Sequence, residues 1–165
     1  MSVLIEASNH GTLGIQPNPI ILSCRNKDSS AIAQYALVRL DFAQTSEQPG
    51  SGDAALGAAS TSKWANVTLA PTTTAASSGG LYGVAQEAIA AGGNGKVMFA
   101  GITQATSSSL TYAVGEAVGL TGSAITAGNV SNATVTTKIG IFVGTAGSSI
   151  TAPRILLQGS LAFGT

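Results

Sequence analysis

The second half of the chain, from residue 81 onward, consists of short apolar segments interrupted by glycines, and this pattern restricts the fold more than any other feature. Residues 81–89 and 96–103 each have the length and apolar content of a β-strand, and the glycine-rich residues 90–95 separate them. Glycine adopts the positive φ angles of tight turns at no steric cost, so these residues predict a β-hairpin. Because no extended helical periodicity follows residue 80, we predict an all-β fold.

The same hairpin pattern recurs near the end of the sequence. Residues 140–147 repeat the strand and turn of residues 83–92, and residues 154–159 repeat residues 96–101. Internal repeats reveal architecture, and two copies of one hairpin predict a small β-barrel or a jelly-roll-like β-sandwich with related halves. A chance match is the alternative, because Ala, Gly, Ser and Thr account for 85 of the 165 residues.

Charged residues are concentrated at the start of the chain. Residues 1–53 hold eight of the fourteen charged side chains, although they make up less than a third of the sequence. Pro17 and Pro19 push the residues before them into extended geometry, which favours an extended arm. We therefore predict three parts: an N-terminal arm with a short hairpin in residues 1–50, a linker with a short strand in residues 51–80, and a β-barrel or β-sandwich domain in residues 81–165.

Two short strands are predicted within the first part. Residues 19–24 form an apolar segment, and the polar residues 26–30 are typical of a turn. In residues 31–42, apolar side chains alternate with other residues toward the end, which favours a strand. A helix is the alternative, because four side chains of this segment also recur at helical spacing. They are Ile32, Tyr35, Ala36 and Arg39.

The composition excludes several kinds of partner. Only 8% of the residues are charged, and seven basic and seven acidic side chains cancel, so there is no cluster of cations for nucleic acid or an anionic membrane. No apolar run reaches the roughly 18 residues of a membrane-spanning helix, and the N-terminus does not resemble a secretory signal. Surface charge keeps protein molecules apart. The low content of charged residues therefore predicts that much of the surface is buried against other copies of the chain.

The sequence also contains few groups capable of catalysis. His10 is the only histidine, Cys24 is the only cysteine, and the carboxylates are scattered. Cys24 lies in an apolar segment and is expected to be a buried, inert thiol, with activation by Arg25 and Lys27 as the alternative. The glycines and lysine of residues 92–96 precede a predicted strand rather than the helix of a phosphate-binding loop. We predict that the protein is not an enzyme and has no cofactor or metal site.

Contacts with other subunits are expected at aromatic, cationic and proline side chains in the first half of the chain, because aromatic residues bury large areas at interfaces. The candidate interface residues are His10, Pro17, Pro19, Arg25, Tyr35, Arg39, Trp64 and Tyr82. Core packing is the alternative for the aromatic members of this set.

A family resemblance rests on residues 82–101, residues 112–118, Gly140 with Ile141, and residues 154–157. Their glycine turns and apolar triplets resemble the barrel segments of tailed-bacteriophage head decoration, or cement, proteins, over roughly residues 81–163. The resemblance implies a small β-rich fold, often trimeric, that binds the outer surface of an icosahedral capsid and stabilises it.

On this basis the expected partners are further copies of the chain, in a homotrimer, and the major capsid protein. The expected location is the exterior of the virion capsid, after synthesis in the host cytoplasm, and residues 1–50 are expected to bridge subunits. The alternative is a phage tail or fibre module that binds host glycans, for which exposed aromatic side chains with polar neighbours in a groove are expected.

Overall fold

The computed structural model describes residues 19–40, 65–70, 81–121, 127–132 and 135–158, and these residues form ten strands and no helix. This confirms the prediction of an all-β fold. The strands are β1 (Ile20–Asn26), β2 (Leu37–Leu40), β3 (Ala65–Leu69), β4 (Tyr82–Ala85), β5 (Asn94–Gln104), β6 (Leu110–Tyr112), β7 (Ala117–Thr121), β8 (Val135–Phe142), β9 (Gly147–Ile150) and β10 (Arg154–Gln158).

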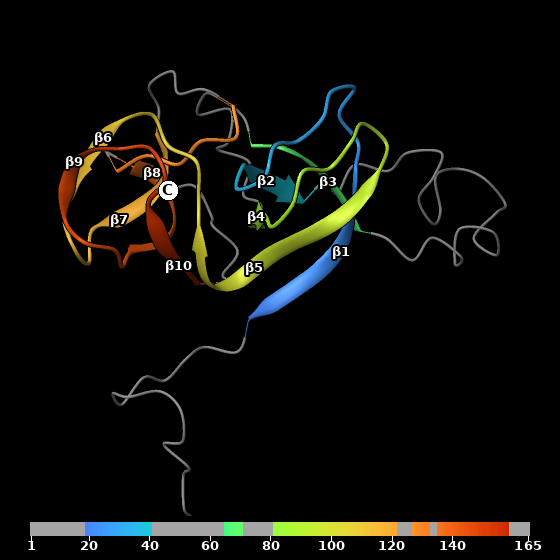
Figure 1. Ribbon diagram of the computed structural model, residues 1–165. Helices are drawn as coiled ribbons and strands as arrows, with labels where there is room; N and C mark the ends of the chain where they lie inside the picture. Colours follow the sequence, from blue (N-terminus) through green and yellow to red (C-terminus); the bar gives the residue numbers. More distant parts are fainter. Residues whose placement is uncertain (1–18, 41–64, 71–80, 122–126, 133–134, 159–165) are drawn as a thin grey trace, which may run out of the picture.

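Five strands close into a small barrel, in the order β1-β3-β2-β4-β5, and β5 pairs back onto β1 (Figure 1). Only β1 and β3 run parallel, and the other pairs in the barrel are antiparallel. The sequence places the barrel in residues 81–165, whereas β1, β2 and β3 come from the predicted arm and linker and supply three of its strands. Residues 1–18 lie outside the described residues.

The segment of residues 31–42 is a strand rather than a helix in the part that is described. Leu37–Leu40 form β2, which pairs on one side with β3 and on the other with β4. Before it, Ile32 forms an isolated antiparallel bridge with Ile89. The segment fits both a strand and a helix by local spacing, and its pairing with strands distant in the sequence makes it a strand.

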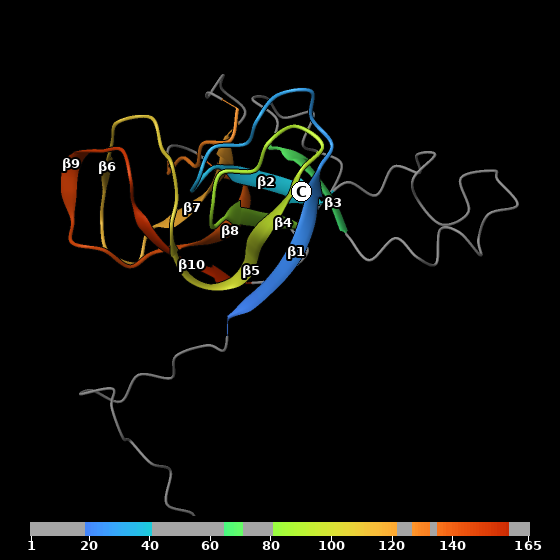
Figure 2. The same cartoon turned by 45° about the vertical axis from the view of Figure 1, so that its right-hand side comes forward.

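The long strand β5 joins the barrel to a second lobe. Its first half pairs with β1 and β4, and its second half pairs with β10, which leads on to β8 and β7. Figure 2 shows β5 curving out of the barrel toward β10. Gly101 lies at this point with a φ of 119°, an angle that L side chains rarely adopt. The short sheet of β6 and β9 completes the second lobe.

Two apolar cores lie on either side of the wall formed by β2, β4 and β5. The barrel core contains Cys24, Ile32, Ala36, Val38, Val67, Ala85, Ile89, Val97 and Phe99. The second core contains Leu37, Ala70, Tyr82, Val84, Met98, Ala105, Tyr112, Val118, Leu120, Val130, Ile139, Phe142, Ile155 and Leu157. Successive side chains of a strand point to opposite faces, so each wall strand contributes to both cores.

The two predicted copies of the hairpin have the same pairing register. In the first copy Val84 pairs with Met98 and Ala85 with Val97, and in the second Ile141 pairs with Leu156 and Phe142 with Ile155. These are corresponding positions of the repeat. Even the closing hydrogen bonds correspond: the Gln86 amide donates to the Lys96 carbonyl, and the Val143 amide donates to the Arg154 carbonyl. The two segments that resemble each other in sequence therefore also pair in the same register in the sheet.

The predicted turn after β1 is held by a buried asparagine. The side-chain amide of Asn26 donates to the carbonyls of Ser30, at 2.8 Å, and of Ile89, at 3.1 Å. Its side-chain oxygen accepts from the Asp28 amide, and Asp28 in turn accepts from the Leu69 amide. Because buried polar groups need partners, this network fixes the β1 end against the β4–β5 hairpin and gives Asp28 a structural role.

Candidate functional site

The structure describes five of the eight candidate interface residues, and they do not form one surface. Pro19 is exposed at the start of β1, close to Gly101. Arg25 is half-buried, and its Nε donates to the Gly92 carbonyl at 3.2 Å. Tyr35 is half-buried and lines a pocket. The other candidates, His10, Pro17 and Trp64, lie outside the described residues.

Arg39 and Tyr82 face each other on paired strands, and Tyr82 belongs to the core. Their backbones are register partners of β2 and β4, and the Tyr82 side chain is only 3% exposed. Burial raises the pKa of the Tyr82 phenol, and the charge of Arg39 partly offsets this increase. Tyr82 is therefore a packing residue within the chain, as the core alternative for the aromatic candidates expects.

An exposed apolar stretch lies at the start of β1, and we call it the β1 apolar segment: Ile20, Ile21 and Leu22. Their side chains are 52%, 44% and 40% exposed, although large apolar residues are usually buried. Among the described residues this half of β1 pairs only with β5, whereas its second half also pairs with β3. From the sequence these residues are predicted only as an apolar strand, because a local pattern does not show how many neighbouring strands each part of it will have.

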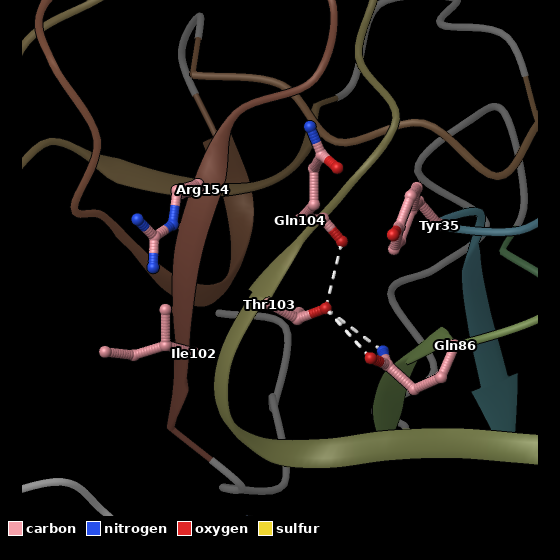
Figure 3. A pocket seen from close by; sticks show the side chains of 6 residues that line it. All are labelled: Tyr35, Gln86, Ile102, Thr103, Gln104 and Arg154. Atoms are coloured by element: carbon pink, nitrogen blue, oxygen red, sulfur yellow. Dashed lines mark hydrogen bonds between the residues drawn. The ribbon is translucent and has the colours of Figure 1, made fainter.

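A pocket of about 300 Å³ lies where β5 leaves the barrel. Figure 3 shows Tyr35 and Gln86 on one side of the end of β5, and Ile102 and Arg154 on the other. Six side chains line the pocket: Tyr35, Gln86, Ile102, Thr103, Gln104 and Arg154. They come from the loop before β2, the residue that follows β4, the second half of β5 and the start of β10. Of these six residues, only Tyr35 is a candidate interface residue from the sequence.

The backbone of Tyr35 has a φ of 65°, which is uncommon for a residue with a side chain. Such a conformation costs about 1–3 kcal/mol and persists only where the surroundings impose it. Here the Tyr35 amide donates to the Ala85 carbonyl at 2.8 Å, and the Tyr35 carbonyl accepts from the Thr106 amide at 2.8 Å. These two bonds fix the backbone of Tyr35 at the edge of the pocket.

The polar floor of the pocket is organised by its own hydrogen bonds. The Gln86 side-chain amide donates to the Thr103 hydroxyl at 3.0 Å and to the Val84 carbonyl at 2.9 Å. The Gln104 side-chain amide donates to the Ala152 carbonyl at 3.4 Å. Dashed lines in Figure 3 show the contact of Gln86 with Thr103. The side chains of Gln86, Thr103 and Gln104 are thus held by hydrogen bonds within the chain.

The residues considered for catalysis have no reactive arrangement in the part of the chain that is described. Cys24 is fully buried in the barrel core, and burial raises the pKa of its thiol to about 11. No group of three His, Cys, Asp or Glu side chains there could hold a metal ion. The described segments also contain no helix of the length and apolarity that spans a membrane.

Comparison with known proteins identifies a structure with a related fold. Neither protein-family models nor curated proteins match the sequence. Among solved structures, the chain is similar to the crystal structure of the head fiber gp8.5 N base in bacteriophage phi29, with a TM-score of 0.50 and 16% sequence identity. The similarity covers 87% of this chain and 97% of that chain. At this level of identity, the similarity establishes the fold.

Proposed function

We propose that this chain is a structural protein of a bacteriophage virion, located on the outer surface of the head. The observation that carries the proposal is the fold shared with the base of the phi29 head fiber over most of both chains. The resemblance of residues 82–101 and 154–157 to decoration proteins supports the same location from the sequence. The protein is made in the host cytoplasm and acts by binding rather than by catalysis.

Within this class, we assign the chain the role of a decoration protein that reinforces the shell. A protein that binds only the assembled shell stabilises it by mass action, and the shell's repeated subunits offer many equivalent sites. The partners are the major capsid protein and two further copies of this chain, because a closed trimer covers equivalent surfaces symmetrically. The low charge of the chain, 8% of its residues, is consistent with extensive contact between copies.

The β1 apolar segment is the surface best suited to this contact. Three consecutive large apolar side chains are each at least 40% exposed, and exposed apolar patches mark sites of protein interaction. The segment directly follows residues 1–18, so both can engage a neighbouring subunit together. Within residues 1–50, we therefore assign the bridging of subunits to this segment together with the residues before it.

A variant in the β1 apolar segment tests the proposal. Replacing Ile21 and Leu22 together by Ser removes exposed apolar area without opening a core cavity, and should reduce both trimer formation and binding to purified shells. Light scattering and cosedimentation with shells measure the two effects. The matched control is Val114→Ser, which removes an apolar side chain that is 66% exposed on the second lobe and should change neither.

A deletion tests the contribution of the N-terminal residues. Removing residues 2–18 leaves Pro19 in place beside Gly101, so the barrel should keep its thermal unfolding midpoint while attachment to shells weakens. Undiminished attachment would refute a bridging role for these residues. A monodisperse monomer at micromolar concentration with no affinity for shells would refute the proposed function itself.

A further inference from the structure

The sheet of the second lobe carries apolar side chains on the face that points away from its core, and we call them the outer apolar row. The row crosses four neighbouring strands, because each member is the register partner of the next: Ile102 of β5, Leu156 of β10, Ile141 of β8 and Ala117 of β7. Register partners lie on the same face of a sheet. Ile102 is 41% exposed, and the other three are partly exposed. Contiguous exposed apolar side chains mark a surface for protein contact.

The opposite face of the same strands fixes the row in its outward position. Ile155 and Phe142 pair in register, and neither side chain is more than 1% exposed. Successive side chains of a strand point to opposite faces, so Leu156 and Ile141 point outward because their neighbours fill the second core. The outer apolar row is therefore a permanent surface of this lobe.

One cation lies within this apolar surface. Arg154 precedes Leu156 by two residues in β10, so the two side chains lie on the same face. Arg154 is exposed and forms no ion pair with another described residue. Figure 3 shows Arg154 and Ile102 on the same side of the end of β5. A guanidinium beside exposed apolar side chains suits a partner segment in which a carboxylate stands next to apolar residues.

One segment of the sequence has this chemistry. Residues 3–6 read Val-Leu-Ile-Glu, and Glu6 is the only one of the seven acidic residues that directly follows three large apolar residues. No other acidic residue therefore matches the apolar row and its cation as closely.

The position of Pro19 brings a neighbouring copy within reach of this segment. Pro19 lies beside Gly101, the residue before Ile102. From Glu6 to Pro19 the chain spans at most about 45 Å when it is fully extended. Pro17 and Pro19 favour extended geometry in the residues before them, which directs the segment away from its own sheet and toward another copy.

We propose that residues 3–6 of one copy dock on the outer apolar row of a neighbouring copy, with the Glu6 carboxylate paired to Arg154. This inference rests on the proposed association of copies and specifies one of its contacts. The ion pair sets the position of the segment, and the apolar side chains supply the buried area. In a closed ring each copy gives one segment and receives one, so every row is covered.

Charge reversal tests the contact in the purified full-length protein without shells. Light scattering over a dilution series gives the concentration at which half of the chains are assembled. Glu6→Lys and Arg154→Glu each bring like charges together, and each should raise this concentration about 10-fold. The combined variant restores an ion pair of the opposite sense and should return to within about 2-fold of the wild type.

A mixture of the two single variants distinguishes a neighbouring copy from the same copy. When Glu6→Lys and Arg154→Glu chains are mixed in equal amounts, each reversed residue meets its complement only across a contact between copies. The mixture should therefore assemble at a lower concentration than either variant alone. If the combined variant is restored but the mixture is not, the segment docks on its own copy, and the proposal is overturned.

The internal repeat supplies a matched control for the charge. The Lys96 carbonyl accepts from the Gln86 amide in the first hairpin, as the Arg154 carbonyl accepts from the Val143 amide in the second. Lys96→Glu therefore reverses a charge at the corresponding place, and it should leave assembly unchanged. An equal loss of assembly in Lys96→Glu would show a general effect of charge and would overturn the specific pairing.

The remaining outcomes separate this inference from the proposed function. If the wild type assembles and neither Glu6→Lys nor Arg154→Glu changes its assembly, the docking contact is wrong, while cosedimentation with shells still tests the structural role. If the wild type stays monomeric at every concentration, both the docking contact and the trimer are wrong, and binding to shells is again measured separately.

Discussion

The buried thiol of Cys24 has a measurable consequence for stability at high pH. Burial raises its pKa from 9.0 to about 11, so the folded state keeps the proton while the unfolded state loses it between these values. The free energy of unfolding should therefore fall as the pH rises from 9 to 11. Urea unfolding of the wild type and of Cys24→Ala across this range checks the effect, and the variant should show the smaller decline.

Reagent access to the same thiol gives a simpler check. At pH 8 the folded protein should not react with a thiol reagent, and the reaction should reach one equivalent only in denaturant. Rapid labelling of the folded protein would favour the alternative in which Arg25 and Lys27 activate the thiol.

The carboxylate of Glu116 stabilises the folded state near neutral pH, and this contribution is lost at low pH. It accepts hydrogen bonds from the Ala113 amide, at 2.8 Å, and from the Asn132 side chain, at 3.0 Å, and these lower its pKa. A lowered pKa stabilises the folded state above the unfolded value, and this contribution disappears as the pH falls through the folded value. Acid unfolding of Glu116→Gln should therefore be less steep than that of the wild type. An unchanged acid transition would contradict this account.

The burial of a single residue could be predicted where the side chains around it are also its neighbours in the sequence. The apolar neighbours of Cys24 indicate a buried thiol, and the structure confirms its burial. Tyr82 differs, because both faces of its strand are covered by a core and only the three-dimensional arrangement shows this. The same is true of the pocket: Gln86, Gln104 and Arg154 have no recognisable spacing in the sequence, and the sheet brings them together.

At the scale of elements, the repeated hairpin contains two glycines that allow close approach. A Cβ on Gly83 would lie 2.8 Å from the Met98 carbonyl oxygen, and a Cβ on Gly140 would collide with the Leu156 carbonyl oxygen. Gly140→Ala should therefore lower the free energy of unfolding by about 1–3 kcal/mol, as overpacking does. Denaturant titration monitored by circular dichroism measures the change.

A glycine at a less crowded position of the same lobe provides the control. At Gly147 the nearest atom would lie 3.6 Å from the added Cβ, so Gly147→Ala should alter stability by less than about 0.5 kcal/mol. Equal losses in the two variants would show that the close contact of Gly140 with β10 does not account for the effect.

Elements within hairpins were predictable because their partners are close in sequence. The β4–β5 pair and its repeat follow from alternating apolar segments around glycine turns, and their register is confirmed. The pairing of β1 with β3 and β5 joins segments about 40 and 70 residues apart. No local pattern specifies such pairings. The division predicted from the sequence therefore placed β1, β2 and β3 outside the barrel, although they form part of it.

At the scale of the whole molecule, the barrel and the second lobe share the wall of β2, β4 and β5. Leu37 and Val38 are neighbours in β2, yet Leu37 belongs to the second core and Val38 to the barrel core. In the same way β5 pairs with β1 and β4 at one end and with β10 at the other. Neither core can be opened without exposing one face of the wall to water.

This shared wall predicts that the two lobes unfold together. Leu37 is fully buried, and Leu37→Ala should destabilise the protein by about 2–5 kcal/mol through the cavity left in the second core. If the wall couples the cores, slow amide exchange should accelerate by a similar factor in β7 and β8 of the second lobe and in β3 on the far side of the barrel. Hydrogen exchange followed by NMR resolves these strands separately. Faster exchange confined to β7 and β8 would instead show that the lobes are independent units, since the barrel would then stay closed while the second core opens.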